Sequence, residues 1–328
     1  MCLAATRSAT LLKDLVHRRN GEQVLVTGVE QCEENRFNVS VHWPRDHRFY
    51  GPCADGGSDP QLVSETMRQA GILVGHVAYD VPKGHSFVMN ELSHTVDWEA
   101  LAPADTRTRL DLEVNCLEVR RRGRTLFGVR GTMVLRREGR EVASGTFDYR
   151  CMSPGVYRRL RAEARSSEDP ALPALPAPVE PVAVGRVRPQ DVVIASSGLP
   201  GTFLLRAERD HPVLYDHPLD HVPGMAIIEA MRQTAQAVTG LSGAVTARMQ
   251  TAFSHYVEHD LPCYLTTGTP TRPDGGAVEV PVQVWQRDQE AARGVIPLSP
   301  CGDGLELTFL PYPSEQRQPV LQLAGRAV

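Results

Sequence analysis

The sequence lacks most of the short motifs that mark common enzyme classes. It has no Walker phosphate loop, no glycine-rich dinucleotide fingerprint and no G-x-S-x-G elbow. These absences argue against nucleotide-dependent enzymes and ordinary serine hydrolases. The 7 cysteines are scattered, with no C-x-x-C pair and no zinc-type spacing. We therefore expect no disulfide framework, no bound metal and no other cofactor.

Long apolar runs and a strong excess of one charge are also missing. No stretch is apolar over the roughly 18 residues that a membrane helix needs, and the N-terminus lacks the apolar core of a signal peptide. The net charge of −4 gives no general attraction to nucleic acid or anionic lipid. The 328 residues, 41% hydrophobic and 23% charged, predict a soluble cytoplasmic protein, long enough for two domains, with neither nucleic acid nor a membrane as partner.

The sequence does contain one pattern twice, 164 residues apart. RDHRFY at 45–50 precedes DPQLVSETMRQAG at 59–71, and RDHPVLYDHP at 209–218 precedes VPGMAIIEAMRQTA at 222–235. The spacing from aspartate to glutamate is 19 residues in both copies, Asp46 to Glu65 and Asp210 to Glu229. Two copies of one unit predict a pseudo-dimer within the chain, with a site between the copies, and leave further oligomerisation open.

Each copy has the pattern of strands, one helix and further strands. Alternating apolar residues predict strands at 24–29 and 36–43. The helices predicted at 61–79 and 225–238 follow them, the first apolar around most of its circumference and the second ending at Gly240. Alternation returns at 110–116, 278–284 and 305–309. The sequence therefore predicts an α+β fold in which antiparallel sheet wraps around a long helix in each copy.

A proline-rich segment separates the two copies. Five prolines lie between 170 and 181, a density that favours an extended strap over helix or central strand. We therefore predict an N-terminal repeat at 1–159, a linker at 160–185 and a C-terminal repeat at 186–328.

The repeated motifs resemble those of known families. VPGM at 222–225, with Glu229 in the helix that it opens, resembles the hotdog fold of β-hydroxyacyl-carrier-protein dehydratases. RDHRFYGP at 45–52 and the E-x-x-R-Q motifs at 65–69 and 229–233 are similar to the A-factor biosynthesis family. That resemblance covers both halves of the chain and implies a double hotdog fold.

The resemblance also implies a reaction. In this family a β-ketoacyl chain passes from acyl carrier protein to a hydroxyl of dihydroxyacetone phosphate. The ester then closes by intramolecular aldol condensation and loss of water to a butenolide phosphate, a precursor of γ-butyrolactone or furan signals. The expected partners are therefore a β-ketoacyl-acyl carrier protein and dihydroxyacetone phosphate, and the expected enzyme is an acyltransferase.

One position departs from the dehydratase pattern. The dehydratase histidine lies 14 residues before the acid of the helix, and this chain has Tyr215 there. His217 and His221 lie 12 and 8 residues before Glu229. We expect a shorter loop in which His217 takes the place of that histidine, and a reaction other than dehydration.

Acyl transfer to an alcohol requires a base, donors for an oxyanion and groups that hold two substrates. His217 or His221 suits the base at neutral pH, and Glu229 would also serve if burial raised its pKa. The helix N-terminus at Gly224 offers N–H groups and close approach to a substrate carbonyl. We predict that this second-copy loop works together with Glu65 of the first helix.

The E-x-x-R-Q motifs offer groups that hold substrate. Each places its side chains on one helical face: Glu65, Arg68 and Gln69 in the first copy, and Glu229, Arg232 and Gln233 in the second. Each arginine either binds the phosphate of the acceptor or neutralises a glutamate in a buried pair. Each glutamine either positions the thioester carbonyl or satisfies the arginine. The histidines of the RDH motifs, His47 and His211, are expected to shape turns.

Two other functions stay open at this stage. A dehydratase or thioesterase acting on acyl thioesters would use His217 and a facing glutamate, and it would not need phosphate-binding arginines. A non-catalytic acyl-binding protein would keep the fold without the site, and the retained His217, His221 and Glu229 argue against it. Fold analogy alone does not separate these functions.

Overall fold

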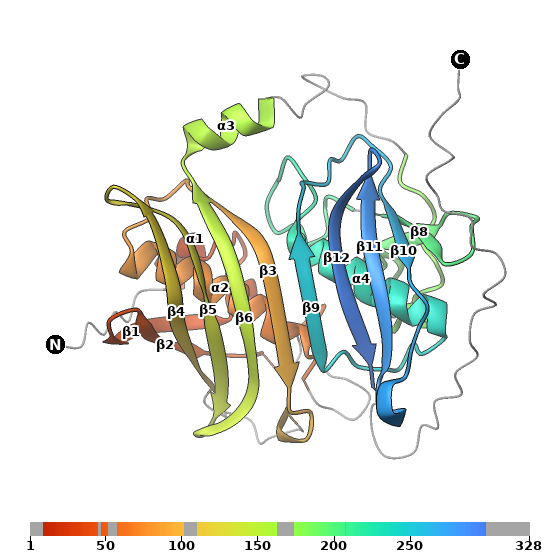
Figure 1. The fold of residues 1–328 in the computed structure, drawn as a ribbon, viewed down its shortest axis with the longest axis horizontal. Helices are drawn as coiled ribbons and strands as arrows, with labels where there is room; N and C mark the ends of the chain where they lie inside the picture. The colour runs from red at the N-terminus through yellow and green to blue at the C-terminus, as the bar shows by residue number, and fades with distance from the viewer. Residues whose placement is uncertain are drawn as a thin grey trace. The chain divides into compact units, whose positions relative to one another are not determined.

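The two halves of the chain fold in the same order, with two strands, one long helix and four further strands (Figure 1). The elements of the first half are β1 Val26–Glu33, β2 Arg36–Val41, α2 Gln61–Ala78, β3 Ser86–Val96, β4 Leu110–Arg122, β5 Thr125–Arg137 and β6 Arg140–Met152. Those of the second half are β7 Ile194–Ser196, β8 Thr202–Leu205, α4 Gly224–Thr239, β9 Arg248–Phe253, β10 Tyr264–Thr267, β11 Val278–Gln286 and β12 Gln289–Leu298. The repeat in the sequence is therefore a repeat of the fold.

The computed structural model describes residues 9–44, 47–51, 58–101, 110–162, 174–206 and 208–299. The chain separates into two units, Met1–Pro170 with Ala247–Gln250, and Ala171–Thr246 with Thr251–Val328. Asp46, the strand predicted at 305–309 and residues 163–173 of the proline-rich segment lie outside the described residues. No helix in the described ranges has the length and hydropathy needed to cross a membrane.

In the first unit, a six-stranded antiparallel sheet packs against α2. The strand order is β1-β2-β4-β5-β6-β3. As predicted from its apolar circumference, α2 is buried along most of its length, and it contacts β1, β2, β3 and β4. Just before the helix, the Asp59 carboxylate accepts the Gln61 N–H at 2.9 Å. On the inner face, the Tyr149 hydroxyl donates to the Gly71 carbonyl at 3.1 Å. Two short helices, α1 Ala9–Leu15 and α3 Pro154–Ala162, flank these elements in the sequence.

The second half of the chain repeats this arrangement with the order β9-β12-β11-β10-β8-β7, and α4 contacts β7, β8, β10, β11 and β12. The alternating valines of β11 are fully buried, as their period predicts. Gly240 ends α4 with φ 72°, and its N–H donates to the Gln236 carbonyl, which confirms it as the C-terminal cap. The predicted α+β fold of sheets wrapped around long helices is therefore confirmed in both units.

Gly145 of β6 marks a position where the first sheet has no room for a side chain. A Cβ there would collide with the Ser93 carbonyl oxygen of β3 and lie 3.0 Å from the His94 Cα. We expect Gly145→Ala to lower the free energy of unfolding by about 1–3 kcal/mol, because backbone atoms must move. Urea unfolding measures this. Gly155→Ala is the control, because no atom lies within 4 Å of its added Cβ. Equal effects of the two substitutions would contradict the prediction.

Candidate active site

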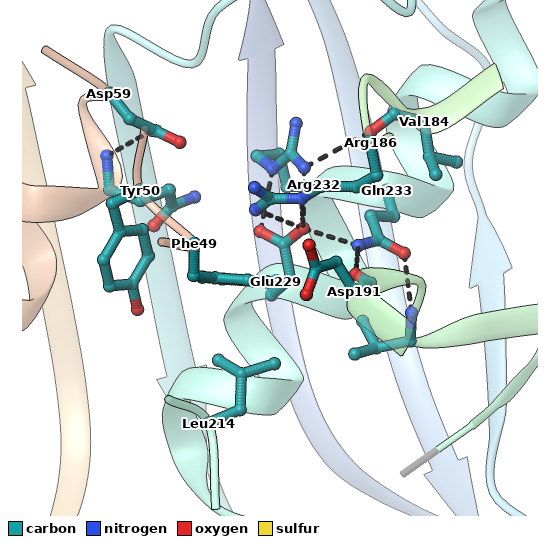
Figure 2. A network of polar contacts seen from close by, with 12 residues as sticks. Phe49, Tyr50, Asp59, Val184, Arg186, Asp191, Leu214, Glu229, Arg232 and Gln233 are labelled. Carbon is teal, nitrogen blue, oxygen red and sulfur yellow. Dashed lines mark hydrogen bonds and ion pairs between the residues drawn. The ribbon is translucent and has the colours of Figure 1, made fainter. Parts of the chain in front are cut away.

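The helix of the second unit carries a buried glutamate between two arginines (Figure 2). The side chain of Glu229 is 2% exposed, and its Oε1 lies 2.8 Å from the Arg186 Nη2. Arg232, one turn further along the helix, reaches Oε1 through Nη2 at 2.6 Å and Oε2 through Nε at 2.8 Å. Arg232 thus uses the planar fork of its guanidinium on one carboxylate.

The first unit contains the same network. The Glu65 side chain is 2% exposed, and its Oε1 lies 2.6 Å from the Arg18 Nη2. Arg68 binds Oε1 through Nη2 at 2.8 Å and Oε2 through Nε at 2.9 Å. Each helix arginine therefore neutralises the glutamate of its own motif, one of the two roles that the sequence left open. Because two arginines share one carboxylate, each network keeps one net positive charge.

The two glutamines tie these networks to the segment that leads into the first strand of each unit. Gln233 donates from Nε2 to Glu229 Oε1 at 2.6 Å and to the Asp191 carbonyl at 2.8 Å, and its Oε1 accepts the Val193 N–H at 2.8 Å. Gln69 makes the equivalent bonds to Glu65, the Gln23 carbonyl and the Leu25 N–H. Of the two roles that the sequence left open for the glutamines, satisfying the arginines is wrong, since they bind the glutamates, and positioning a thioester carbonyl stays a prediction.

The arginines also decide the protonation of both glutamates. Burial by itself would raise the pKa of Glu229, but the charges of Arg186 and Arg232 outweigh it and lower the pKa to about 2. Arg18 and Arg68 likewise overcome burial and lower the pKa of Glu65 to about 2. The expectation that burial makes Glu229 a base at neutral pH is therefore wrong in direction. A carboxylate with so low a pKa is a weak base, which argues against Glu65 or Glu229 as the general base.

These pKa values predict two losses of stability as the pH falls. Burial, opposed by Glu65 and assisted by Arg18, lowers the pKa of His47 from 6.5 to about 4. The stability that depends on neutral His47 is complete above pH 6.5 and disappears as the pH falls toward 4, because the unfolded chain takes up the proton first. The ionised glutamates contribute fully above pH 4.5, and their contribution disappears as the pH falls through 2. The free energy of unfolding, measured in urea across this range, should show both losses.

A His47→Asn variant isolates the first loss. Asparagine keeps an acceptor for nearby backbone N–H groups and does not titrate. The variant should show a flatter profile between pH 6.5 and 4 and the same loss below 4.5. An unchanged profile above pH 4.5 would show that His47 is not the titrating group.

The histidines of the two RDH motifs shape turns, as predicted. His47 Nδ1 accepts the N–H groups of Phe49 at 3.2 Å and Tyr50 at 3.1 Å. His211 Nδ1 accepts those of Val213 at 3.2 Å and Leu214 at 3.0 Å. Because Nδ1 is an acceptor in both rings, Nε2 carries the proton of the neutral form.

The loop before α4 holds both candidate bases. His221 is partly exposed, with its Nδ1 2.8 Å from Asp220 Oδ1 and its ring against Tyr256. Because the carboxylate accepts Nδ1–H, the Nε2 of His221 is the ring nitrogen that can take a proton. His217 has a weaker partner, with 3.9 Å between its Nδ1 and Asp216 Oδ2. Tyr215, at the dehydratase histidine's position, is buried.

Gly224 begins α4 directly after Pro223, which has extended backbone angles. The Pro223 carbonyl accepts the N–H groups of Ala226 and Ile227. The N–H groups of Gly224 and Met225 precede these bonds and have no partner within the helix. They are the donors that the sequence predicted at this end.

The sequence reasoning missed Arg18 and Arg186. Each lies seven residues before the residue whose N–H binds the glutamine, Leu25 or Val193, just ahead of the first strand. Aligning the segments that precede the first strand of each copy would have found this shared spacing. Within the described residues, no group of three His, Cys, Asp or Glu side chains is arranged to hold a metal ion.

The paired units, each a sheet wrapped around one helix with its own buried network, define a double hotdog protein. The model of the A-factor biosynthesis hotdog domain matches residues 3–153 and 167–302. The chain belongs to the A-factor biosynthesis hotdog family.

Curated relatives support this membership along most of the chain. A 2-oxo-3-(phosphooxy)propyl 3-oxoalkanoate synthase of Streptomyces virginiae is 39% identical over 86% of this chain and 95% of the relative. One from Streptomyces coelicolor is 36% identical over 82% of this chain and 85% of the relative. Among solved structures, one described as an oleoyl thioesterase from Lactobacillus plantarum aligns with TM-score 0.50 and 12% identity, over 81% of this chain and 95% of that chain. That likeness shows the fold alone.

Proposed function

We propose that this protein is an acyltransferase that moves a β-ketoacyl chain from acyl carrier protein to a hydroxyl of dihydroxyacetone phosphate. The observation that carries this proposal is the match along most of the chain to synthases named for a 3-oxoalkanoate ester of a phosphooxypropyl group. The buried networks add a physical reason, since each keeps a net positive charge suited to an anionic substrate. Because acyl carrier protein would deliver the chain, we place the reaction in the cytoplasm.

The loop before α4 supplies the groups for the transfer step. In the proposal, the acceptor hydroxyl attacks the thioester carbon while His221 Nε2 takes its proton, and Asp220 holds the ring in the required tautomer. The N–H groups of Gly224 and Met225 stabilise the oxyanion. The carbon–sulfur bond then breaks, and His221 returns the proton to the leaving thiolate. The ester and a free carrier thiol are the products.

The ester contains the groups needed for ring closure. Its methylene carbon lies between two carbonyl groups, so a base removes its proton readily. The resulting carbanion attacks the ketone carbon of the dihydroxyacetone part, and loss of water gives the butenolide phosphate. His221, which accepts the hydroxyl proton in the transfer step, is also available to remove the proton of this methylene carbon.

Intact-mass analysis of the acyl carrier protein tests the proposed transfer. The carrier should lose its β-ketoacyl group when the protein and dihydroxyacetone phosphate are both present, and keep it when the acceptor is left out. Loss of the acyl group without the acceptor would instead identify a thioesterase. An unchanged thioester under both conditions would leave the protein as an acyl-binding protein and contradict the proposal.

A further inference from the structure

The two networks differ in whether their outer donors have a partner inside the protein. In the second unit, Arg232 Nη1 donates to Gln236 Oε1 at 2.7 Å, and Gln236 is itself fixed by the Ala244 carbonyl at 2.9 Å. The position of Gln236, four residues after the arginine, is occupied in the first unit by Ile72. Ile72 has no polar side-chain atom, so it offers the arginine no acceptor.

Among the residues that the structure describes, one donor of Arg68 therefore has no acceptor. Its Nε and Nη2 bind Glu65, and no described residue accepts a hydrogen bond from its Nη1. The Arg68 side chain is 18% exposed, whereas that of Arg232 is 9% exposed. A guanidinium with one edge fixed on a carboxylate and the other edge accessible is preorganised to bind a second oxyanion.

The turn histidines show the same difference between units. In the second unit, His211 Nε2 lies 3.2 Å from Asp191 Oδ1, which accepts a hydrogen bond from the ring N–H. In each unit the motif glutamine donates a hydrogen bond to one backbone carbonyl, that of Asp191 in the second unit and that of Gln23 in the first. Gln23 is therefore the equivalent of Asp191. No described residue accepts a hydrogen bond from His47 Nε2, and the charges of Glu65 and Arg18 both act on this ring.

We infer that the first unit holds the phosphate group of the acceptor substrate, with Arg68 Nη1 as the main donor and His47 Nε2–H as a second. The network of the second unit is closed by Gln236 and Asp191 and acts as a scaffold. The net positive charge shared by Arg18, Glu65 and Arg68 attracts the dianion, and the two spare donors bind it. This inference rests on the proposed function, because that function supplies a phosphate monoester as substrate.

Isothermal titration with dihydroxyacetone phosphate, without acyl donor, tests the inference. Arg68→Gln should weaken binding about tenfold or more, because one charge-assisted donor is lost. Arg232→Gln is the matched variant and should change binding less than about twofold. Dihydroxyacetone, which lacks the phosphate, should show no difference between wild type and Arg68→Gln. Equal losses in the two arginine variants, or a loss confined to Arg232→Gln, would overturn the inference.

A second pair of variants keeps both arginines. Ile72→Gln places an acceptor where the second unit has one, and should weaken phosphate binding by occupying Arg68. Ile72→Met changes the side chain without adding a comparable acceptor and should bind like wild type. Equal binding by both variants would contradict an open Arg68 donor.

Steady-state kinetics of acyl transfer distinguish a failure of this inference from a failure of the proposed function. With acyl donor present, Arg68→Gln should raise KM for dihydroxyacetone phosphate about tenfold and change kcat less. Acyl transfer with an unchanged KM would overturn the inference while the proposed function stands. Binding of dihydroxyacetone phosphate that depends on Arg68, without any acyl transfer, would overturn the proposed function while the inference stands. A wild type that neither binds the phosphate ester nor transfers the acyl group would overturn both.

Discussion

Replacing Glu229 by alanine is expected to lower the free energy of unfolding by about 3–5 kcal/mol, because it leaves two buried guanidinium groups without their anion. The Glu229 carboxylate accepts hydrogen bonds from Arg186, Arg232 and Gln233, and its side chain is 2% exposed. Urea unfolding at neutral pH measures the change. Glu65→Ala should have an effect of similar size, because Arg18 and Arg68 surround Glu65 in the same way.

An exposed ion pair provides the control for this prediction. Glu33 pairs with Arg36 at 3.2 Å, and the two side chains are 68% and 42% exposed. Glu33→Ala should change the free energy of unfolding by less than about 1 kcal/mol. A Glu229→Ala variant as stable as Glu33→Ala would show that the buried network does not hold the helix to the sheet.

Replacing His221 by alanine is expected to reduce kcat/KM for acyl transfer by about a hundredfold or more, because the proton acceptor is removed. Asp220→Asn should cause a smaller loss, because the amide no longer fixes the proton on Nδ1 of His221. His221 is partly exposed, so its substitution should leave the free energy of unfolding nearly unchanged. Activity and unfolding measured on the same samples separate a catalytic loss from a folding defect.

Two further histidines test the assignment of this role. His217→Ala should retain more activity than His221→Ala, because His217 lies 3.9 Å from its carboxylate partner and is less firmly oriented. His255, exposed and bonded through Nδ1 to the Glu290 carbonyl, is the control and should be nearly silent. A larger loss from His217→Ala than from His221→Ala would place the base at position 217.

The two long helices and the strands predicted at 24–29, 36–43, 110–116 and 278–284 were predictable because they depend on local periodicity. The helix predicted at 61–79 is Gln61–Ala78, and the one predicted at 225–238 is Gly224–Thr239. Apolar residues around most of the circumference of a helix require other structure to enclose it, which is why one pattern predicted both the helix and its burial. The turn roles of His47 and His211 were predictable for the same local reason, since each ring binds N–H groups two and three residues ahead.

The chemistry of the networks was not predictable, because it depends on residues far apart in the sequence. Arg18 lies 47 residues before Glu65, and Arg186 lies 43 before Glu229. Without them, burial predicts a raised pKa for each glutamate. With them, the pKa falls to about 2. The difference between the two units was hidden for a related reason: the exchange of Gln236 for Ile72 resembles an ordinary core substitution until Arg232 is seen to bind Gln236.

The most direct test of the account is to follow the carbon atoms of the acceptor into the product. The protein is incubated with β-ketoacyl carrier protein and carbon-13-labelled dihydroxyacetone phosphate, and the products are identified by mass spectrometry. Acyl transfer to dihydroxyacetone phosphate predicts one phosphorylated product, an ester or its butenolide, that contains both the acyl chain and the labelled carbons. Free β-keto acid, with all label remaining in dihydroxyacetone phosphate, would contradict acyl transfer and show that water is the acceptor.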